Sequence, residues 1–213
     1  MKILAISDIH GRINYDKKII EVLSSADLIV ISGDITNFGG KKEALAILNT
    51  IKEFNSNILA VPGNCDHFDV LDVLKLENIN LHGEIKEFRS MIFFGIGGSG
   101  YTPFKTPQEY SDEEIERILS NYKRQDGKQI FVSHAPPFNT KVDKTLIGMH
   151  VGSKHIREFI ENHQPDLCIC GHIHEARNTD RIGRTIIVNP GPFPKFYGMM
   201  DITDEIKVEL YNA

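Results

Sequence analysis

The feature that most constrains this chain is a short apolar run followed within three residues by Asp, His or Asn, which occurs five times. The runs lie at residues 3–6, 28–31, 57–61, 129–132 and 166–170. Continuous apolar runs of this length are typical of strands covered on both faces of a sheet. Helical patterns at 16–23 and 41–54 separate the first three runs. Such strand–helix–strand repetition predicts parallel strands joined by right-handed crossovers.

The rest of the chain adds a hairpin, two helices and C-terminal antiparallel strands. A capping box at Ser111–Glu114 starts a helix that we expect to run to about Arg124, and Ser153 should cap a helix ending near Asn162. The remaining strands are expected at residues 84–88, 91–96, 185–188, 198–202 and 206–210. We therefore expect two sheets packed on each other with helices outside, in a single domain covering residues 1–213.

Composition excludes several classes of protein. The formal net charge is -5, with 41% hydrophobic and 25% charged residues, as in ordinary globular proteins. This acidic balance argues against a surface that coats nucleic acid. No apolar run approaches the roughly 20 residues that cross a bilayer, so no membrane partner is expected. Cys168 and Cys170 are too close for an ordinary bridge, and the start lacks a secretory signal, so we expect a reducing, cytoplasmic location.

Polar side chains at the ends of the five predicted strands carry the chemistry. Ligands bind at the carboxyl ends of parallel strands, so these side chains should meet at one edge of a sheet. The candidates are Asp8, His10, Asp34, Asn64, His134, His172 and His174. Each alone is more simply a capping or loop residue. Their joint placement instead predicts a mixed imidazole and carboxylate site for Mn, Fe, Zn or a similar divalent ion.

The same motifs resemble those of the calcineurin-like metallophosphoesterase family over nearly the whole chain. They read Asp8-Ile9-His10, Gly33-Asp34, Gly63-Asn64-Cys65-Asp66, His134 and Gly171-His172-Ile173-His174. Further segments at 133–137, 150–153 and 189–192 are similar to a small prokaryotic subgroup described as cyclic-nucleotide-phosphodiesterase-like. The resemblance implies an α/β fold, α+β in some schemes, built as a four-layer α-β-β-α sandwich of two mixed sheets packed face to face.

The resemblance also implies two divalent metal ions per chain, with Mn preferred and Ni, Fe, Zn or Mg as alternatives. One ion would be held by Asp8, His10, Asp34 and His174. The other would be held by Asp34, Asn64, His134 and His172, so that Asp34 bridges the two. The expected reaction is hydrolysis of a small phosphate ester, with a phosphodiester favoured, by attack of a hydroxide that bridges the ions.

Cys65 departs from the family pattern, in which most members have His at that position. That His is thought to protonate the leaving group, so the general acid is left open here between Cys65, His150 and His67. In the simpler interpretation, His67 is an early residue of a helix capped by Asp66.

Other functions of the same fold remain open. They are a phosphomonoesterase, a nuclease and a non-catalytic metal-binding scaffold, although all seven ligand positions are filled. Nucleic acid is disfavoured as a partner by the acidic charge. We expect substrate selectivity to lie in loops 97–110 and 135–152. The sequence leaves the oligomeric state open, with a homodimer among the options.

Overall fold

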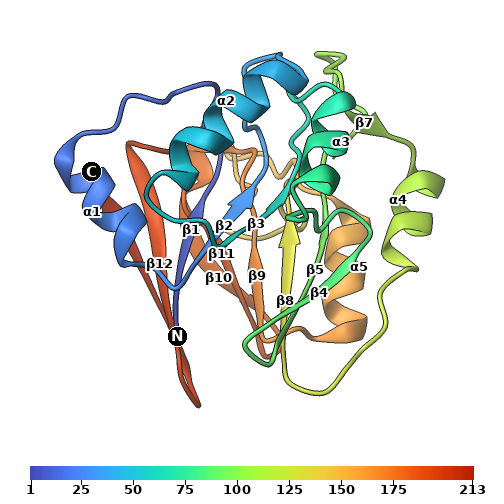
Figure 1. Cartoon of the computed structure of the whole chain (residues 1–213). Coiled ribbons are helices and arrows are strands. Elements are labelled where there is room, and N and C mark those ends of the chain that lie inside the picture. The colour runs from blue at the N-terminus through green and yellow to red at the C-terminus, as the bar shows by residue number, and fades with distance from the viewer.

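A computed structural model describes all residues, 1–213, and arranges them as two sheets with helices on their outer faces (Figure 1). The first sheet has the order β13–β12–β1–β2–β3. Its strands are β1 (Lys2–Ile6), β2 (Leu28–Ser32), β3 (Ile58–Val61), β12 (Phe196–Ile202) and β13 (Ile206–Asn212). β1, β2 and β3 are parallel, whereas β12 and β13 pair antiparallel.

The second sheet has the order β10–β11–β9–β8–β5–β4. Its strands are β4 (Ile85–Phe88), β5 (Met91–Ile96), β8 (Lys128–Ser133), β9 (Leu167–Ile169), β10 (Asn178–Ile182) and β11 (Thr185–Asn189). The four inner strands are parallel, and the two edge strands are antiparallel to their neighbours. A small separate ribbon pairs β6 (Ser99–Gly100) with β7 (Glu109–Tyr110).

Five α-helices form the outer layers (Figure 1). The first sheet is covered by α1 (Lys17–Ser25), α2 (Lys41–Lys52) and α3 (Asp69–Leu76), and the second by α4 (Asp112–Leu119) and α5 (Lys154–His163). Ser153 caps α5 by accepting a hydrogen bond from the backbone N–H of Ile156 at 3.3 Å. A 3₁₀ turn, η1 (His174–Ala176), follows β9. No helix is both long and apolar enough to cross a membrane.

Alternation along the strands produces three buried apolar layers. In β1, Leu4 belongs to the cluster shared with α1, α2 and α3, whereas its neighbour Ile3 belongs to the cluster between the sheets. In β8, Ile130 faces the inter-sheet layer and Phe131 packs with α4 and α5. Successive side chains of a strand point to opposite faces, so runs apolar at every position fill both layers. The predicted four-layer arrangement of two mixed sheets is confirmed.

Three local predictions differ from the structure. The helix at Ser111 ends at Leu119 rather than near Arg124, because Tyr122 turns inward and its hydroxyl donates to Gln129 at 3.1 Å. The strand at 178–182 was not predicted, since an edge strand of largely polar sequence has no apolar signal. The helix proposed to follow Asp66 starts only at Asp69, and Asp66 does not cap it.

The strand ends that carry polar residues belong to two sheets rather than to one. β1, β2 and β3 lie in the first sheet, and β8 and β9 lie in the second. Both sets run in the same direction, so that their carboxyl ends reach the top of the molecule as drawn in Figure 1. The expectation of a single sheet edge was therefore wrong, and the polar residues meet where the two sheets face each other.

Candidate metal centre

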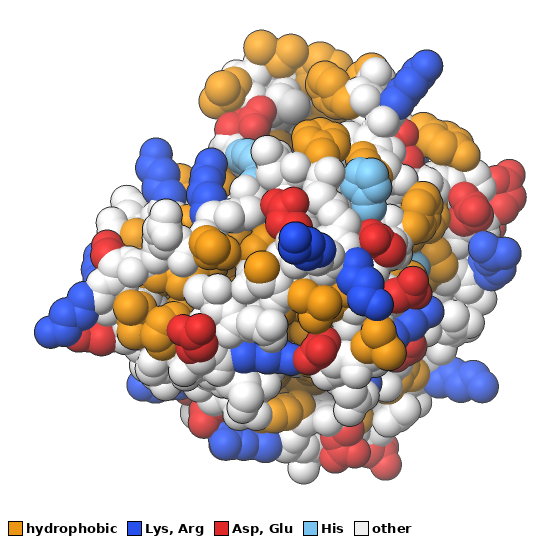
Figure 2. All heavy atoms as spheres, turned by 45° about the horizontal axis from the view of Figure 1, so that its top comes forward, with side chains coloured by type: hydrophobic (Ala, Val, Ile, Leu, Met, Phe, Trp, Pro, Cys, Tyr) orange, Lys and Arg blue, Asp and Glu red, His pale blue; other side chains and the backbone are white.

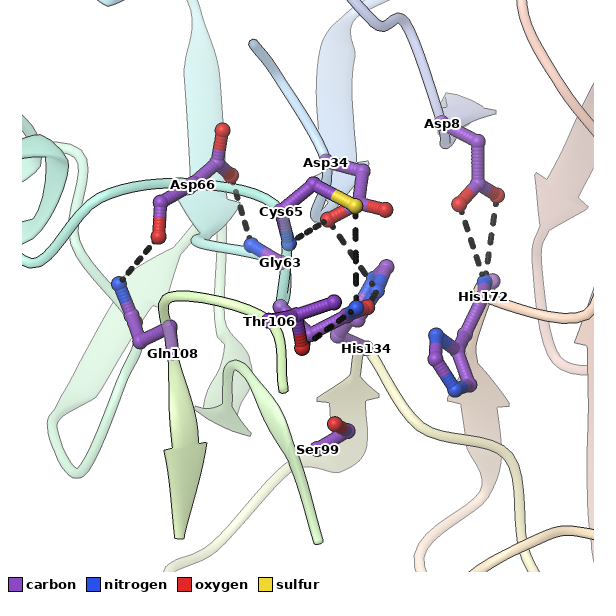
Figure 3. Close-up of polar contacts among 12 residues, drawn as sticks. Asp8, Asp34, Gly63, Cys65, Asp66, Ser99, Thr106, Gln108, His134 and His172 are labelled. Carbon is purple, nitrogen blue, oxygen red and sulfur yellow. Dashed lines mark hydrogen bonds and ion pairs between the residues drawn. The ribbon is translucent and has the colours of Figure 1, made fainter. Parts of the chain in front are cut away.

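The seven predicted ligands all lie in loops that directly follow strands. Asp8 and His10 follow β1, Asp34 follows β2, Asn64 follows β3, His134 follows β8, and His172 and His174 follow β9. Figure 3 shows Asp8, Asp34, His134 and His172 grouped between the two sheets. Figure 2 shows the same end of the molecule from outside, where histidines lie among interspersed acidic, basic and hydrophobic side chains.

One half of the cluster consists of Asp8, His10 and His174, whose potential ligand atoms lie within 4.8 Å of one another. The Nε2 atoms of His10 and His174 are 3.1 Å apart, and His174 Nε2 is 3.4 Å from Asp8 Oδ1. The buried Nδ1 of His10 has no hydrogen-bond partner. Two imidazole nitrogens and a carboxylate oxygen therefore converge on one point, as a divalent cation requires.

The other half contains His134 and Asn64. His134 Nδ1 lies 2.8 Å from the carbonyl oxygen of Ser32, which can only accept, so Nδ1 carries the proton. Asn64 donates through Nδ2 to Thr106 Oγ1 at 3.0 Å, which turns its Oδ1 toward His134. His134 Nε2 and Asn64 Oδ1 are then two acceptors only 2.8 Å apart. A cation placed between these lone pairs relieves their repulsion, so the donor set fits a metal ion.

Asp34 lies between the two halves. Its Oδ1 is 3.4 Å from His134 Nε2, and its Oδ2 is 3.7 Å from His10 Nε2. The backbone N–H of Cys65 donates to Oδ1 at 2.8 Å and fixes the carboxylate (Figure 3). Each oxygen of Asp34 therefore faces a different histidine, which is the geometry that a bridging ligand needs.

His172 adjoins the cluster through its backbone and its ring. Its backbone N–H donates to both carboxylate oxygens of Asp8 at 3.2 Å, and its ring centroid is 5.0 Å from that of His134. Burial lowers the pKa of His172 to about 3 and also lowers the pKa of His10. Both rings are therefore neutral near pH 7, which is the form that binds metal.

Negative charge is concentrated at the centre. Burial opposes ionisation of Asp8, yet its hydrogen bond with His174 and the nearby His134 hold its pKa down at about 2. Burial, reinforced by the charge of Asp8, raises the pKa of Asp34. Burial and the charge of Asp34 also raise the pKa of Asp66 to about 6. Burial and a neighbouring negative charge thus disfavour the ionised forms of Asp34 and Asp66. A nearby cation stabilises carboxylates of this kind as anions.

The backbone around the cluster is strained. Asp8, His10, Asp34 and His172 all have left-handed backbone conformations, with φ values of 54°, 46°, 49° and 69°. Such residues cost on the order of 1–2 kcal/mol each outside glycine. Backbone hydrogen bonds hold two of them, from Asp8 N to Gly33 O at 3.0 Å and from His10 N to Asp34 O at 2.9 Å. Non-glycine residues in this conformation are concentrated at functional sites.

Glycine is required at two of the motif positions because other groups pack against the backbone. A Cβ atom at Gly63 would overlap Oδ1 and the backbone nitrogen of Asp34. A Cβ atom at Gly171 would overlap the Ser7 hydroxyl and lie 2.9 Å from Asp8 Oδ2. These glycines therefore allow the carboxylates to lie against the neighbouring loops.

Asp66 has a role that the sequence interpretation missed. Instead of capping a helix, its carboxylate accepts backbone N–H bonds from Gly63 at 2.7 Å, Ile35 at 3.1 Å and Thr36 at 2.7 Å. It thereby ties the loop after β2 to the loop after β3, and with them Asp34 to Asn64. The position of Asp66 inside the Gly-Asn-Cys-Asp motif was the signal that could have indicated this.

The three candidate general acids lie in different places. Cys65 is buried, and its Sγ is within 4.8 Å of ligand atoms of His10 and Asp34. Burial and the charge of Asp34 raise the pKa of its thiol, which stays protonated. His67 is exposed and makes no side-chain hydrogen bond with the cluster. His150 Nδ1 lies 2.7 Å from Asp143 Oδ1. Of the three, Cys65 is the one whose side-chain atom groups with candidate ligand atoms, and all three roles stay predictions.

Comparison with known proteins agrees with this geometry. The sequence model described as calcineurin-like phosphoesterase matches residues 1–176. The uncharacterized protein MJ1162 of Methanocaldococcus jannaschii is 43% identical over 196 residues, which cover 90% of this chain and 88% of that protein.

Two more distant proteins are also similar. The probable glycerophosphodiester phosphodiesterase GpdQ of Arcobacter nitrofigilis is 25% identical over 195 residues, covering 86% of this chain and 68% of that protein. The crystal structure of TT1561 of Thermus thermophilus superimposes with a TM-score of 0.75 at 21% identity, covering 99% of this chain and 98% of that one. At that identity the structural likeness concerns the fold alone.

Proposed function

The chain belongs to the calcineurin-like phosphoesterase family and is a metal-dependent hydrolase of phosphate esters, and on that premise we propose that its substrate is a small phosphodiester. The similarity to a probable glycerophosphodiester phosphodiesterase supports a diester over a monoester. The acidic net charge of -5 favours a small substrate over a nucleic acid.

The proposed centre holds two divalent ions, and the position of Asp34 is the observation that carries this proposal. Its two oxygens lie 3.4 Å from His134 Nε2 and 3.7 Å from His10 Nε2. One carboxylate can span ions about 3.5–4 Å apart. Asp8, His10 and His174 would complete one side, and Asn64, His134 and His172 the other. We propose manganese as the native metal. Nickel, iron, zinc and magnesium are alternatives, because nitrogen and oxygen ligands suit all of these ions.

When bound, two such ions supply a water of lowered pKa as the nucleophile and withdraw charge from the phosphate oxygens. The chain fixes the geometry of this chemistry. The Ser32 carbonyl keeps the proton of His134 on Nδ1, so that Nε2 faces the site. Asn64 supplies a neutral oxygen, which leaves more positive charge available for the phosphate than a carboxylate would.

The leaving alkoxide requires a proton, and Cys65 is the candidate that the geometry favours. Its thiol lies beside His10 and Asp34 and is protonated. His150 Nδ1 is engaged by Asp143, and His67 is exposed, and neither side chain forms a hydrogen bond with a candidate ligand.

The test is a matrix of metals and substrates. Metal-free protein is reconstituted with Mn, Ni, Mg or Zn, its metal content is measured, and turnover is followed on bis-p-nitrophenyl phosphate and p-nitrophenyl phosphate. We expect two ions per chain and higher kcat/KM for the diester, with Mn the most active. Binding of one ion only, or preference for the monoester, would contradict the proposal.

A further inference from the structure

A cavity of about 600 Å³ lies beside the candidate metal centre and has His172 in its lining. Ser99, Gly100 and Tyr101 also line it, together with Val151 and Gly152 and the first residues of α4 and α5. Figure 3 shows Ser99 on the side of the cluster toward which the His172 ring points. The volume falls in the range of pockets that hold small organic molecules.

Of the seven candidate ligands, only His172 lines the cavity. This position limits the kind of chemical group that the cavity can bind. A phosphate bound at the metal centre lies beyond one end, so the cavity is placed to receive a group esterified to that phosphate. Tyr101 and Val151 contribute apolar surface to the lining and are 75% and 44% exposed. Exposed apolar side chains that flank a cleft are typical of ligand contacts.

Gly100 belongs to the cavity lining and has open space beside it. A Cβ atom added at Gly100 would meet no atom within 4 Å, and its φ lies outside the left-handed region. The position therefore tolerates a larger side chain, which would take up space at the lining. At Gly63 and Gly171, in contrast, a Cβ atom would overlap neighbouring atoms.

Charged side chains of both signs line the cavity beside the starts of α4 and α5. Asp112 and Glu113 line it together with Lys154 and His155, and His155 Nε2 lies 3.2 Å from Asp112 Oδ1. The N-termini of the two helices favour negative charge, which offsets the two carboxylates. Size, rather than charge, is therefore the property of a bound group that this lining constrains.

We propose that this cavity binds one of the two alcohols of the diester and that Gly100 sets the size of alcohol accepted. The inference rests on the proposed diesterase function, since it assigns the substrate class of the same site.

The size limit is tested with Gly100→Leu, using Gly100→Ala as the smaller step. The substrates are methyl p-nitrophenyl phosphate and bis-p-nitrophenyl phosphate, assayed with the Mn-loaded protein. We expect Gly100→Leu to lower kcat/KM for the bulky diester about tenfold relative to the methyl ester, mainly through KM. Gly100→Ala should fall between the wild type and Gly100→Leu. Equal effects on both substrates, or no effect, would overturn the inference.

A binding measurement gives a second readout that does not depend on turnover. Calorimetry with methylphosphonate and benzylphosphonate should show weaker binding of only the benzyl compound to Gly100→Leu. If the wild type binds two ions but neither hydrolyses the esters nor binds the phosphonates, the proposed function fails. If the wild type hydrolyses both esters but Gly100→Leu leaves their ratio unchanged, only this inference fails.

Discussion

The candidate metal cluster and the cavity beside it share His172 but are built in opposite ways. The cluster lies at strand ends, with four left-handed residues and with glycines whose missing Cβ atoms leave no spare space. The cavity is lined largely by loop residues and the starts of helices, and Gly100 has open space beside it. The candidate ligands are therefore fixed by packing, whereas the selectivity that we propose lies in residues that can change at little cost to the fold.

The two regions also differ in how their polar groups are satisfied. At the cluster, buried acceptors such as His134 Nε2 and Asn64 Oδ1 face one another. In the cavity wall, the Ser153 hydroxyl already caps α5 and the Ser111 hydroxyl caps α4. The cluster therefore needs a cation to satisfy its buried acceptors, whereas the cavity needs only a bound group of complementary shape.

Asp34→Asn should produce the largest effect, because it removes the charge of the bridging carboxylate. We expect Mn-dependent turnover of bis-p-nitrophenyl phosphate to fall about a thousandfold, since a metal contributes several kcal/mol to the transition state. Metal content should fall from two ions per chain. Near-normal activity of this variant would contradict the two-ion scheme. Glu205→Gln, at an exposed acid in the turn between β12 and β13, serves as the control.

Cys65→Ala sharpens the comparison within the cluster by testing the leaving group. If the thiol protonates an alkoxide, turnover of an alkyl diester such as glycerophosphoethanolamine should fall about a hundredfold. Bis-p-nitrophenyl phosphate should lose far less, because p-nitrophenolate leaves without a proton. A change in this ratio for His150→Ala or His67→Ala, without one for Cys65→Ala, would move the role to that histidine.

Gly171→Ala and Gly100→Ala make the same chemical change in the two regions. The first forces a methyl group against Ser7 and Asp8 and should lower the free energy of unfolding by about 2 kcal/mol. The second should leave stability unchanged or slightly raised, because it restricts the unfolded chain. Thermal and urea denaturation of the metal-free proteins measure both. Equal losses would show that the two regions are packed alike.

Thr106→Val tests a contact between the cluster and the loop that follows the cavity residues of β6. Thr106 lies in this loop, between β6 and β7, and orients Asn64. Its Oγ1 accepts from Asn64 Nδ2 at 3.0 Å. Without this acceptor, metal affinity should fall about tenfold, as is usual when a partner of a ligand is lost. Thr106→Ser should restore the affinity in calorimetric titrations. Unchanged affinity in Thr106→Val would mean that Asn64 is held by other contacts.

His82 lies outside both regions and should show the smallest effect, in the pH dependence of stability. Burial, with a smaller effect of Lys75, lowers its pKa from 6.5 to about 4, and its Nδ1 accepts from Gly97 N at 3.0 Å. The unfolded chain therefore takes up the proton first, so stability present above pH 6.5 is lost as the pH falls toward 4.

Between pH 7 and pH 5.5 this contribution is about 1 kcal/mol. It is measured as the difference between the urea-unfolding curves of the wild type and His82→Gln, which cancels the titration of the metal cluster. A difference that does not vary with pH would show that His82 titrates alike in both states.

Much of the fold could be predicted because its strands are short apolar runs whose positions also follow from their flanking residues. The capped starts at Ser111 and Ser153 were correct, since capping depends on local sequence. The end of α4 and the edge strand at 178–182 were not predicted, because each depends on contacts with distant residues. All seven candidate ligands could be named for the same reason. Asp8, Asp34, Asn64, His134 and His172 each come shortly after a strand, and His10 and His174 lie two residues beyond Asp8 and His172.

The sequence by itself determined which side chains are available for chemistry, because residue type and the direction of each strand are encoded locally. Only the tertiary structure decided how they combine. It divides the strands between two sheets, turns the two oxygens of Asp34 toward histidines from different sheets, and brings Cys65 beside His10 and Asp34. It also creates the cavity at His172 from segments far apart in the chain. These features depend on the packing of one sheet against the other, and no local pattern in the chain specifies that packing.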